Sequence, residues 1–579
     1  MKMNLRQRLK ADFSTAIQAA FGPEFATIDP SIQSASQSQF GDFQANFAMG
    51  LAKQLKKKPA EIAQAVIPYI PQPTRFTKLE VSGPGFINIH LAPDFLSQWL
   101  QQVFIDDRIG VTPASTLDTI VIDYGSPNVA KEMHVGHLRS TIIGDSLVRV
   151  LTFLGHKVIR QNHVGDWGTQ FGMLIEYLSD IQWQPSAQQT MGDLNELYKK
   201  AKARFDNDPD FATRSRNQVV ALQSGDAKTT QLWKQLVTES EQHFQAVYER
   251  LGVLLTLEDI RGESFYNPYL PQVVQDLLDR GIAEPNQGAI TVFLPGFVDP
   301  DNKPLPFLIQ KTDGGYLYAT TDLAAARYRL QTLKATRLIY VVDARQSQHF
   351  NMLFAAVRKA GWASESVRIE HAAFGALLGP DRKPFKTRSG ETIRLVDLLD
   401  EAEQRATNIV AGKSHLSKDQ QQEIARAIGI GALKYADLSN EKIKDYVFDW
   451  NRMLSFEGNT APYLQNAYVR IKAIFRKGNI NKLDSKPLQI NHEIEHRLSV
   501  KLLELPYIIT LVAEELAPNR LCNYLFELAT HFHQFYEHCP VLTAENAVLR
   551  DSRLTLCEMT ARVFQLGLYL LGISVVEQM

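Results

Sequence analysis

Short apolar runs separated by longer amphipathic stretches mark the middle of the chain. The runs cover residues 119–123, 157–160, 337–342 and 368–374. Runs of this kind are typical of strands buried on both faces of a parallel sheet, with crossover helices between them. The stretches 136–153 and 322–333 have the pattern of such helices. We therefore predict an α/β fold with a Rossmann-like parallel-sheet core.

The pattern changes on both sides of this core and once inside it. Helical stretches such as 59–67 mix with the alternating segment 85–91, and 106–116 has the composition of a linker. Residues from about 180 to 285 form a charged, Gln-rich helical insertion, and no convincing strand follows residue 394. The predicted domains are a small α+β domain at 1–115, the Rossmann-like domain at 116–395 with the insertion at about 180–285, a helical connecting region at 396–455 and an all-α domain at 456–579.

Composition excludes several classes of protein. No apolar stretch reaches the roughly 18 residues of a membrane span, and 1–13 carries charges where a signal peptide needs an apolar run. The three cysteines, Cys522, Cys539 and Cys557, form no Cys-x-x-Cys pair, so neither a disulfide framework nor a zinc site is supported. We expect a cytoplasmic protein without a membrane segment.

The charge balance bears on the kind of partner. With 62 Lys+Arg against 63 Asp+Glu the net charge is -1. Such a balance leaves no strong electrostatic footprint of the kind that nucleic-acid binding usually requires. Taken alone, it argues mildly against a nucleic-acid partner.

The loop after the first core strand is the first candidate site. In an open parallel sheet, ligands bind beyond the carboxyl ends of the strands, where helix N-termini gather. Residues 123–138 there read DYGSPNVAKEMHVGHL, rich in Gly, Pro and polar groups. The dinucleotide motif Gly-x-Gly-x-x-Gly is absent, and the Gly412-Lys-Ser414 triplet has Thr407 where a Walker loop needs its first glycine. We interpret that triplet as a helix C-terminus.

Three interpretations of His134-Val-Gly136-His137 stay open on the residues alone. Two His at this spacing could bind a metal, but no His-Glu-x-x-His helix supplies further ligands. The pair could merely cap or pack a helix start. In a nucleotide site, Gly136 would let an adenine approach the backbone, and the imidazoles and helix N-terminus would face phosphate.

A basic loop follows the last core strand. Residues 379–390 read GPDRKPFKTRSG and place Lys383, Lys386 and Arg388 within six residues. Three cations there could neutralise a polyphosphate during its transfer. A solvated basic loop would have the same composition, so both interpretations remain.

The segment 126–141, SPNVAKEMHVGHLRST, closely resembles the signature of arginyl-tRNA synthetases, a family of class I aminoacyl-tRNA synthetases. The likeness extends to YATTD at 318–322, to 340–350 and to NTAPYLQNAY at 459–468, so it covers nearly the whole chain. It implies a Rossmann catalytic core, an N-terminal domain that contacts the tRNA elbow and a C-terminal domain that reads the anticodon.

The resemblance also implies a reaction and its partners. Arginine and ATP give arginyl-adenylate and pyrophosphate, and the arginyl group then passes to the terminal adenosine of tRNA(Arg) with release of AMP. The family usually works as a monomer. Mg²⁺ is expected only through the ATP phosphates, so we predict no protein metal ligands and no zinc.

The resemblance assigns residues to each substrate. His134, Gly136, His137, Lys386 and Arg388 would hold ATP. The arginine positions are Asp123, Ser126, Asn128, His134, Tyr318, Asp322 and Gln346. A guanidinium offers a planar fork of donors and a permanent charge, so its selection requires carboxylates and side-chain acceptors. Asp123 and Asp322 provide two carboxylates, although either could be only a helix N-cap.

One departure concerns the second class signature. The usual Lys-Met-Ser-Lys-Ser is replaced by 386–390, KTRSG, which keeps the first lysine and lacks the second. Some members of the family vary in the same way, and a lysine just before the His-x-Gly-His motif is thought to compensate. Lys131 occupies that position, so we hypothesise that Lys131 and Lys386 share the neutralisation of pyrophosphate. Lys131 could otherwise be an ordinary solvated lysine.

The C-terminal zone has basic and aromatic residues of the kind that bind unpaired bases. Residues 470–486 contain six basic side chains and a single acidic one, Asp484. The basic residues are Arg470, Lys472, Arg476, Lys477, Lys482 and Lys486. We take Tyr463, Asn466 and Arg470 as candidate anticodon contacts. A helix with core aromatics and a charged outer face would have the same composition.

Two other functions remain possible on the sequence. A nucleotidylyltransferase would share the His-x-Gly-His site but predicts no C-terminal RNA domain. A synthetase-like protein without catalysis could survive as an RNA-binding module.

Overall fold

The computed structural model describes residues 3–183, 191–383, 385, 392–411, 416–481, 483 and 488–579. The chain forms two compact units. We call Ser115–Leu454 with Leu570–Ile573 the core unit. Met1–Ala114, Ser455–Tyr569 and Ser574–Met579 form the second, which we call the terminal unit.

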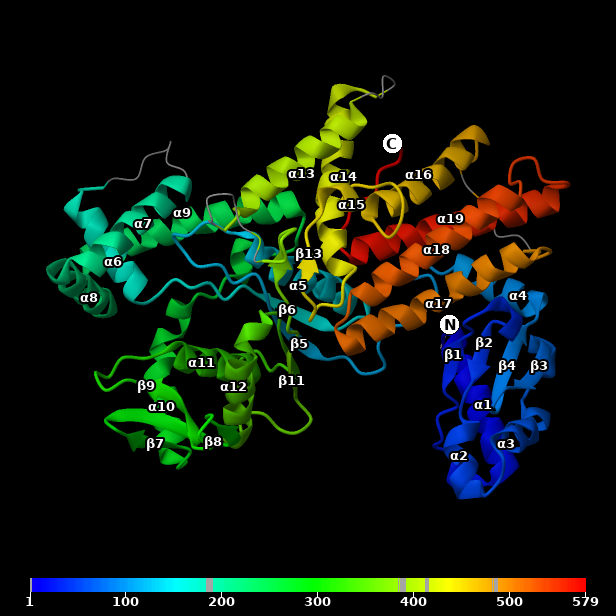
Figure 1. Cartoon of the computed structure of the whole chain (residues 1–579), viewed down its shortest axis with the longest axis horizontal. Coiled ribbons are helices and arrows are strands. Elements are labelled where there is room, and N and C mark those ends of the chain that lie inside the picture. Colours follow the sequence, from blue (N-terminus) through cyan, green and yellow to red (C-terminus); the bar gives the residue numbers. More distant parts are fainter. Residues whose placement is uncertain are drawn as a thin grey trace. The chain divides into compact units, whose positions relative to one another are not determined.

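A four-stranded parallel sheet lies at the centre of the core unit (Figure 1). Its strands are β5 (Thr119–Asp123), β6 (Lys157–Gln161), β10 (Arg337–Tyr340) and β11 (Arg368–His371). Every core strand predicted from the apolar runs is confirmed, although β10 and β11 end two to three residues earlier than expected. The spatial order is β11-β10-β5-β6, and all neighbours are parallel.

This order determines where a ligand can bind. The chain passes from β5 to β6, which lies on one side of β5 in the sheet. The later strand β10 lies on the opposite side of β5, and β11 lies beyond β10. Loops after β5 and β10 therefore diverge at the carboxyl edge, which is the switch point where doubly wound sheets bind ligands. Asp123, the last residue of β5, lies in register with Tyr340 and Gln161 there.

Helix α5 (Val135–Phe153) packs very closely against the end of β5. A Cβ added at Gly144 would lie 2.4 Å from the Cβ of Tyr124. Any side chain there would push the helix away from the strand, so glycine is required for this approach. The predicted helix at 136–153 is confirmed within one residue.

Two more helices flank the same edge. Helix α11 (Tyr318–Gln331) begins four residues before the predicted start at 322, and α12 (Ser347–Lys359) follows β10. Since α11 starts at Tyr318, Asp322 lies inside the helix. The N-cap interpretation of Asp322 is therefore wrong.

The insertion is helical as expected, but it ends in a sheet that the pattern did not indicate. Helix α6 (Thr169–Asp180) precedes the insertion, and its own helices are α7 (Met191–Asn207), α8 (Pro209–Gln223), α9 (Ala227–Leu251) and α10 (Leu270–Asp279). The antiparallel sheet consists of β7 (Ala283–Asn286), β8 (Ala289–Val298) and β9 (Pro304–Gln310). Pro295, Gly296 and Pro306 interrupt its apolar runs, and the β8–β9 register shifts between Phe293 and Val298. These interruptions hide the alternation that marks a strand.

The connecting region is mostly helical. It contains α13 (Leu395–Val410), α14 (Lys418–Leu438) and α15 (Trp450–Met453). The expectation of no strand after residue 394 is wrong for β13 (Tyr446–Val447), which pairs in parallel with β12 (Leu377–Leu378). Two residues are too few to produce a period in the sequence. The triplet Gly412–Ser414 lies outside the described residues.

The terminal unit combines both flanks of the chain. Its N-terminal part has the antiparallel sheet β1-β2-β4-β3. These strands are β1 (Ile32–Ser34), β2 (Phe43–Ala45), β3 (Phe76–Ser82) and β4 (Phe86–Leu91). Its helices are α1 (Leu5–Phe21), α2 (Ala48–Leu55), α3 (Pro59–Val66) and α4 (Pro93–Phe104). The C-terminal part is all helical: α16 (Ala461–Lys477), α17 (Glu493–Glu515), α18 (Asn519–His538) and α19 (Ala547–Leu570).

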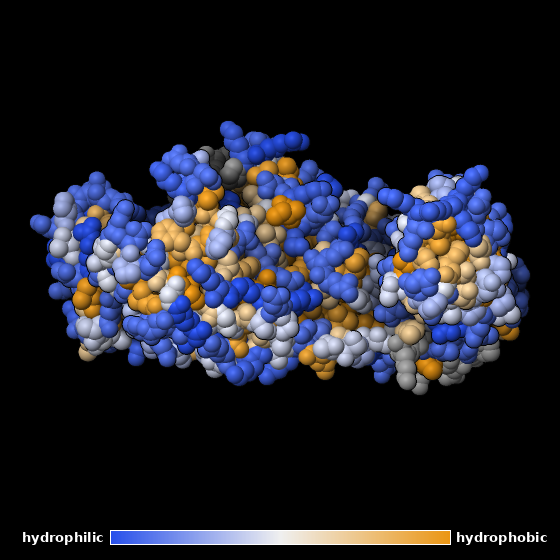
Figure 2. Space-filling model, turned by 90° about the horizontal axis from the view of Figure 1, so that it is seen from below, coloured by the Kyte–Doolittle hydropathy of each residue, from blue (hydrophilic) through white to orange (hydrophobic). Residues whose placement is uncertain are grey.

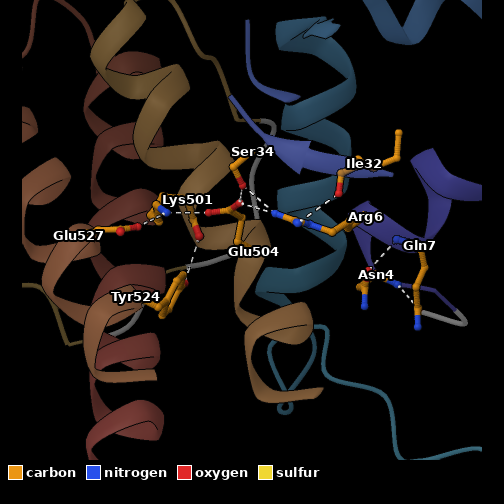
Figure 3. A network of polar contacts seen from close by, with 9 residues as sticks. All are labelled: Asn4, Arg6, Gln7, Ile32, Ser34, Lys501, Glu504, Tyr524 and Glu527. Carbon is orange, nitrogen blue, oxygen red and sulfur yellow. Dashed lines mark hydrogen bonds and ion pairs between the residues drawn. The ribbon is translucent and has the colours of Figure 1, made fainter. Parts of the chain in front are cut away.

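A buried polar network joins these two parts of the terminal unit (Figure 3). Glu504 on α17 accepts hydrogen bonds from Arg6 at 3.2 Å, from Lys501 at 2.7 Å and from the hydroxyl of Ser34. Burial opposes a charge on Glu504, but Lys501, Ser34 and Arg6 together hold its pKa below the ordinary value. Lys501 also reaches Glu527 on α18 at 2.7 Å. Residues from opposite ends of the sequence therefore share one charged cluster.

The surface drawn in Figure 2 is mostly polar, and the cysteine side chains are buried. Hydrophilic residues cover most of the face drawn in Figure 2. Across the described ranges, no helix has both the length and the apolarity to cross a membrane. Cys522, Cys539 and Cys557 are all buried as free thiols.

Candidate active site

The loop from β5 to α5 arranges its two histidines as an interlocked pair. His134 is the N-cap of α5, and its Nδ1 accepts a hydrogen bond from the Gly136 N–H at 3.1 Å. The His134 N–H in turn donates to Nδ1 of His137 at 3.0 Å. The two ring centroids are 4.0 Å apart. The capping interpretation is therefore correct as geometry, and the two hydrogen bonds use the Nδ1 atoms of the rings.

The hydrogen bonds fix what these rings offer. Because both Nδ1 atoms accept, a neutral ring must carry its proton on Nε2. Burial, and then the Lys131 charge, lowers the pKa of His134, and burial followed by His134 lowers that of His137 to about 3. Both rings are thus neutral at pH 7, and each presents one Nε2–H donor, which suits an anionic oxygen.

Gly136 has a local reason to be glycine. A Cβ at this position would lie 2.8 Å from Cε1 of the His134 ring. The imidazole pair could not keep its arrangement with a larger residue there.

Asp123 lies at the carboxyl end of β5, but its charge already has a partner. Its Oδ2 accepts from Nη2 of Arg329 at 2.7 Å, and Oδ1 accepts from the Ser126 hydroxyl at 3.2 Å. Arg329 is 1% exposed and also donates to Gln161 of β6 at 2.6 Å. From the sequence, we predict that the Asp123 carboxylate binds a guanidinium. In the structure this role is weakened, because Arg329 already balances the charge.

Asp322 lies one turn after Tyr318 on α11, so both side chains share a face of the helix. Its carboxylate contacts Nε2 of His349 at 2.6 Å and lies 3.9 Å from Nε2 of His163. Tyr318 is 67% exposed. Among the described residues, no lysine or arginine forms an ion pair with Asp322, so this carboxylate can meet an incoming cation.

Glu263 is the acidic neighbour that the sequence analysis missed. It starts the short helix η6 (Glu263–Tyr269), and its N–H bonds to the Val164 carbonyl at 3.1 Å. Burial, and then the carboxylates of Asp166 and Asp322, raises the pKa of Glu263 to about 8. Burial, and then the charge of Glu263, raises the pKa of the Tyr318 hydroxyl. A second carboxyl group therefore lies within electrostatic reach of Tyr318 and Asp322, and its raised pKa keeps it mostly protonated at pH 7.

No pattern in the sequence could have singled out Glu263. The acid gains its burial from backbone contacts between two remote loops, 162–164 and 260–263. A single Glu in an irregular segment is part of no periodic pattern, so the sequence does not indicate its position in the fold.

The remaining predicted arginine positions surround the same edge. Ser126 has a left-handed backbone with φ 49°, and its N–H donates to Asn162 at 2.8 Å. Asn128 forms a bridge with Gly165. Gln346 is exposed at the end of η7 (Ala344–Gln346), directly before α12.

The basic candidates differ in how far the structure describes them. Nζ of Lys131 lies 4.6 Å from the ring centroid of Tyr198 on α7. Lys383 is exposed in a turn closed by the Gly379 N–H. Lys386 and Arg388 lie outside the described residues.

The three C-terminal candidates lie on α16 in the terminal unit. A groove of about 600 Å³ runs beside Asn466 and Arg470 and is also lined by Lys477 and Tyr536. The Arg470 guanidinium lies 5.3 Å from the Tyr536 ring centroid. Tyr463 is held by a 2.8 Å hydrogen bond to His533. Tyr536 comes from α18, so the sequence analysis of α16 alone did not include it. Lys482, Asp484 and Lys486 lie outside the described residues.

Family models and relatives agree with this arrangement. Residues 99–450 match the catalytic domain of class I (R) tRNA synthetases, residues 464–579 the DALR anticodon binding domain, and residues 7–91 the arginyl tRNA synthetase N terminal domain. Arginine--tRNA ligases of Shigella flexneri serotype 5b and of Escherichia coli (strain ATCC 8739) are each 50% identical, with 100% of both chains covered. The chain belongs to the arginyl-tRNA synthetase family.

Solved arginyl-tRNA synthetases share the fold along the whole chain. The Plasmodium falciparum enzyme superposes with a TM-score of 0.87 at 30% identity, covering 100% of both chains. The Thermus thermophilus enzyme has a TM-score of 0.83 at 25% identity and covers 99% of this chain and 100% of its own. The anticodon-domain match excludes the nucleotidylyltransferase alternative, which predicted no such domain.

Proposed function

We infer that this chain is an arginine–tRNA ligase. It activates L-arginine with ATP to arginyl-adenylate and pyrophosphate. It then transfers the arginyl group to the 3′-terminal adenosine of tRNA(Arg) and releases AMP. The observation that carries this function is the full-length likeness to arginine--tRNA ligases, together with the His134–His137 pair at the switch point of the sheet.

The imidazole pair binds the ATP phosphates in this proposal. Two neutral Nε2–H donors lie at the N-terminus of α5, and each can hydrogen-bond phosphate oxygen. Gly136 permits the pair, while Lys131, Lys386 and Arg388 supply positive charge for the departing pyrophosphate. The described donors here are imidazole and ammonium groups, whereas Mg²⁺ prefers oxygen ligands. The metal would therefore enter on the phosphates alone.

The arginine side chain binds beside α11. Asp322 and Glu263 supply carboxylates for the guanidinium, and Tyr318 supplies a hydroxyl on the same face. Asp123 acts mainly through Arg329, by fixing the end of β5 under the substrate. The other arginine contacts carried over from the family are Ser126, Asn128, His134 and Gln346.

The reaction at this site requires that the two substrates be oriented, and it does not require an activated nucleophile on the protein. The arginine carboxylate oxygen attacks the α-phosphorus of ATP, a new O–P bond forms, and the bond to the pyrophosphate oxygen breaks. The nucleophile belongs to the substrate, so no covalent enzyme intermediate forms. The protein contributes positioning and charge stabilisation.

Glu263 makes arginine binding depend on pH. With a pKa of about 8 the free carboxyl is mostly protonated at pH 7, and a guanidinium beside it favours the ionised form. Affinity for arginine should therefore rise with pH up to about 8, and fall about tenfold per pH unit well below it. Arginine KM in ATP–pyrophosphate exchange, measured from pH 6.5 to 8.5, gives this slope.

Glu263→Gln should remove that slope, because the amide does not titrate. Glu258→Gln, at an exposed acid of the preceding short helix η5 (Leu257–Asp259), is the matched control and should keep it. An arginine KM for the unsubstituted enzyme that stays flat across this range would contradict the role of Glu263.

The groove beside α16 is the proposed anticodon site. In the groove, Tyr536 offers a ring face for unpaired bases, Asn466 an amide edge, and Arg470 and Lys477 charges for the backbone. Tyr463, on the same helix as Asn466, is a further candidate for stacking. The domains at 1–115 and 456–579 would then contact the tRNA elbow and the anticodon. We further propose that the enzyme is a cytoplasmic monomer.

A charging assay tests the function directly. Purified protein with ATP, Mg²⁺ and total tRNA should attach labelled arginine to RNA, and should leave lysine and the other amino acids unattached. Retention of RNA binding with no charging of any amino acid would instead support the non-catalytic RNA-binding alternative.

A further inference from the structure

The helical insertion contacts the signature loop (residues 126–133) at three consecutive residues. The Ala130 N–H donates to Oγ of Ser240 on α9 at 3.0 Å. Next, the Lys131 ammonium lies over the Tyr198 ring, 4.6 Å from its centroid. Then Nδ2 of Asn195 donates to Oε2 of Glu132 at 3.3 Å. Both α7 and α9 therefore hold this one stretch of loop.

The loop needs such support. Ala130 has φ 61°, a left-handed conformation that residues with a Cβ rarely adopt. Glu132 is also bound from the other side by Arg394 at 3.2 Å. The Ala130 backbone and the Glu132 side chain on either side of Lys131 are thus held in place, whereas these contacts leave the Lys131 side chain itself unrestrained.

Tyr198 supplies a restraint on the Lys131 side chain. A free lysine side chain samples many rotamers, and an aromatic face that attracts the ammonium reduces this freedom. The ring belongs to a long helix, so it gives the ammonium a fixed place close to the imidazole pair. The Lys131 charge is near enough to lower the pKa of His134.

We propose that Tyr198 is a positioning residue, which orients Lys131 toward the ATP phosphates and makes the insertion a part of the ATP site. The inference rests on the role proposed above for Lys131. It predicts that the ring matters through Lys131 alone, whereas a purely structural Tyr198 would matter through the stability of α7.

Four variants separate these possibilities: Tyr198→Phe, Tyr198→Leu, Lys131→Ala and the double variant Lys131→Ala/Tyr198→Leu. Arginine-dependent ATP–pyrophosphate exchange, with tRNA(Arg) present, gives KM for ATP and for arginine. The matched control is Phe205→Leu on the same helix, whose ring carries Nζ of Lys202 at 5.9 Å and the Arg216 guanidinium at 5.6 Å. It removes the same kind of contact without touching the loop.

Exchange should fall about tenfold in kcat/KM for ATP with Tyr198→Leu, while the arginine KM stays unchanged. Tyr198→Phe should remain within about twofold, because a phenyl face also attracts a cation. Lys131→Ala should fall at least as far as Tyr198→Leu, and the double variant should be no slower than Lys131→Ala. Phe205→Leu should behave as the unsubstituted enzyme.

Several results would overturn the inference. Losses that multiply in the double variant would show that Tyr198 acts without Lys131. Equal losses in Tyr198→Phe and Tyr198→Leu would assign the effect to the hydroxyl. Full activity of Lys131→Ala, in an enzyme that still charges tRNA, would remove the role of Lys131 and leave the proposed function standing. A protein that charges no tRNA at all would reject both.

Discussion

Asp322→Asn should raise the arginine KM by about 30- to 700-fold while the ATP KM stays within about twofold. Loss of a charge-assisted, partly buried contact to a guanidinium costs roughly 2–4 kcal/mol, and each 1.4 kcal/mol is a factor of ten. Asparagine keeps the shape and an oxygen for His349, which contacts Asp322 at 2.6 Å. The change therefore removes charge and little else. Arginine-dependent ATP–pyrophosphate exchange with each substrate varied in turn gives both constants.

Asp322→Ala should in addition abolish selection for arginine over lysine and citrulline. The matched control is Asp301→Asn, because Asp301 is an exposed acid between β8 and β9. An arginine KM close to that of the unsubstituted enzyme in Asp322→Asn would refute the assignment. So would an equal rise in the ATP KM, which would indicate general damage to the site.

His134→Asn should reduce the rate of adenylate formation by about 10²- to 10³-fold without unfolding the protein. Asparagine is a good N-cap, so its Oδ1 can replace Nδ1 as the acceptor for the Gly136 N–H. It cannot replace the Nε2–H donor. Removing one donor from a site that stabilises developing charge typically has an effect of this size. Arginine-dependent ATP–pyrophosphate exchange gives the rate of adenylate formation, and thermal unfolding gives the stability of the fold.

His134→Ala provides the contrast, since it removes the cap as well and should lower stability by about 1 kcal/mol more than asparagine does. His538→Asn, at the exposed C-terminal end of α18, controls for the substitution itself. If His134→Asn keeps normal exchange, the pair has only its capping role and the ATP phosphates bind elsewhere.

Local patterns were enough to predict the core of the molecule and part of its site. The apolar runs predicted β5, β6, β10 and β11 because each strand carries its own signal. The spacing of Tyr318 and Asp322 is also local, and one turn of α11 places them on a common face.

The rest depends on contacts between remote segments. Arg329 reaches Asp123 across 206 positions of sequence, so no motif around Asp123 could reveal that its charge is matched. Glu263, Tyr198 and Tyr536 became candidates only when the fold brought their helices to a substrate-facing loop or groove. The even balance of charge misled for a related reason, because a total over the chain averages separate surfaces.

The make-up of the terminal unit has a consequence for how the protein is produced. Its N-terminal part, Met1–Ala114, is synthesised first, but its helical partner begins only at Ser455. At about 5–20 residues per second, the ribosome needs roughly 20–70 s to cross the interval between them. During that time Arg6 and Ser34 lack Glu504, with which they will share a buried cluster. The core unit in turn waits for Leu570–Ile573. Neither unit has all of its segments until its C-terminal segment has been synthesised, so newborn chains depend on remaining unaggregated during that interval.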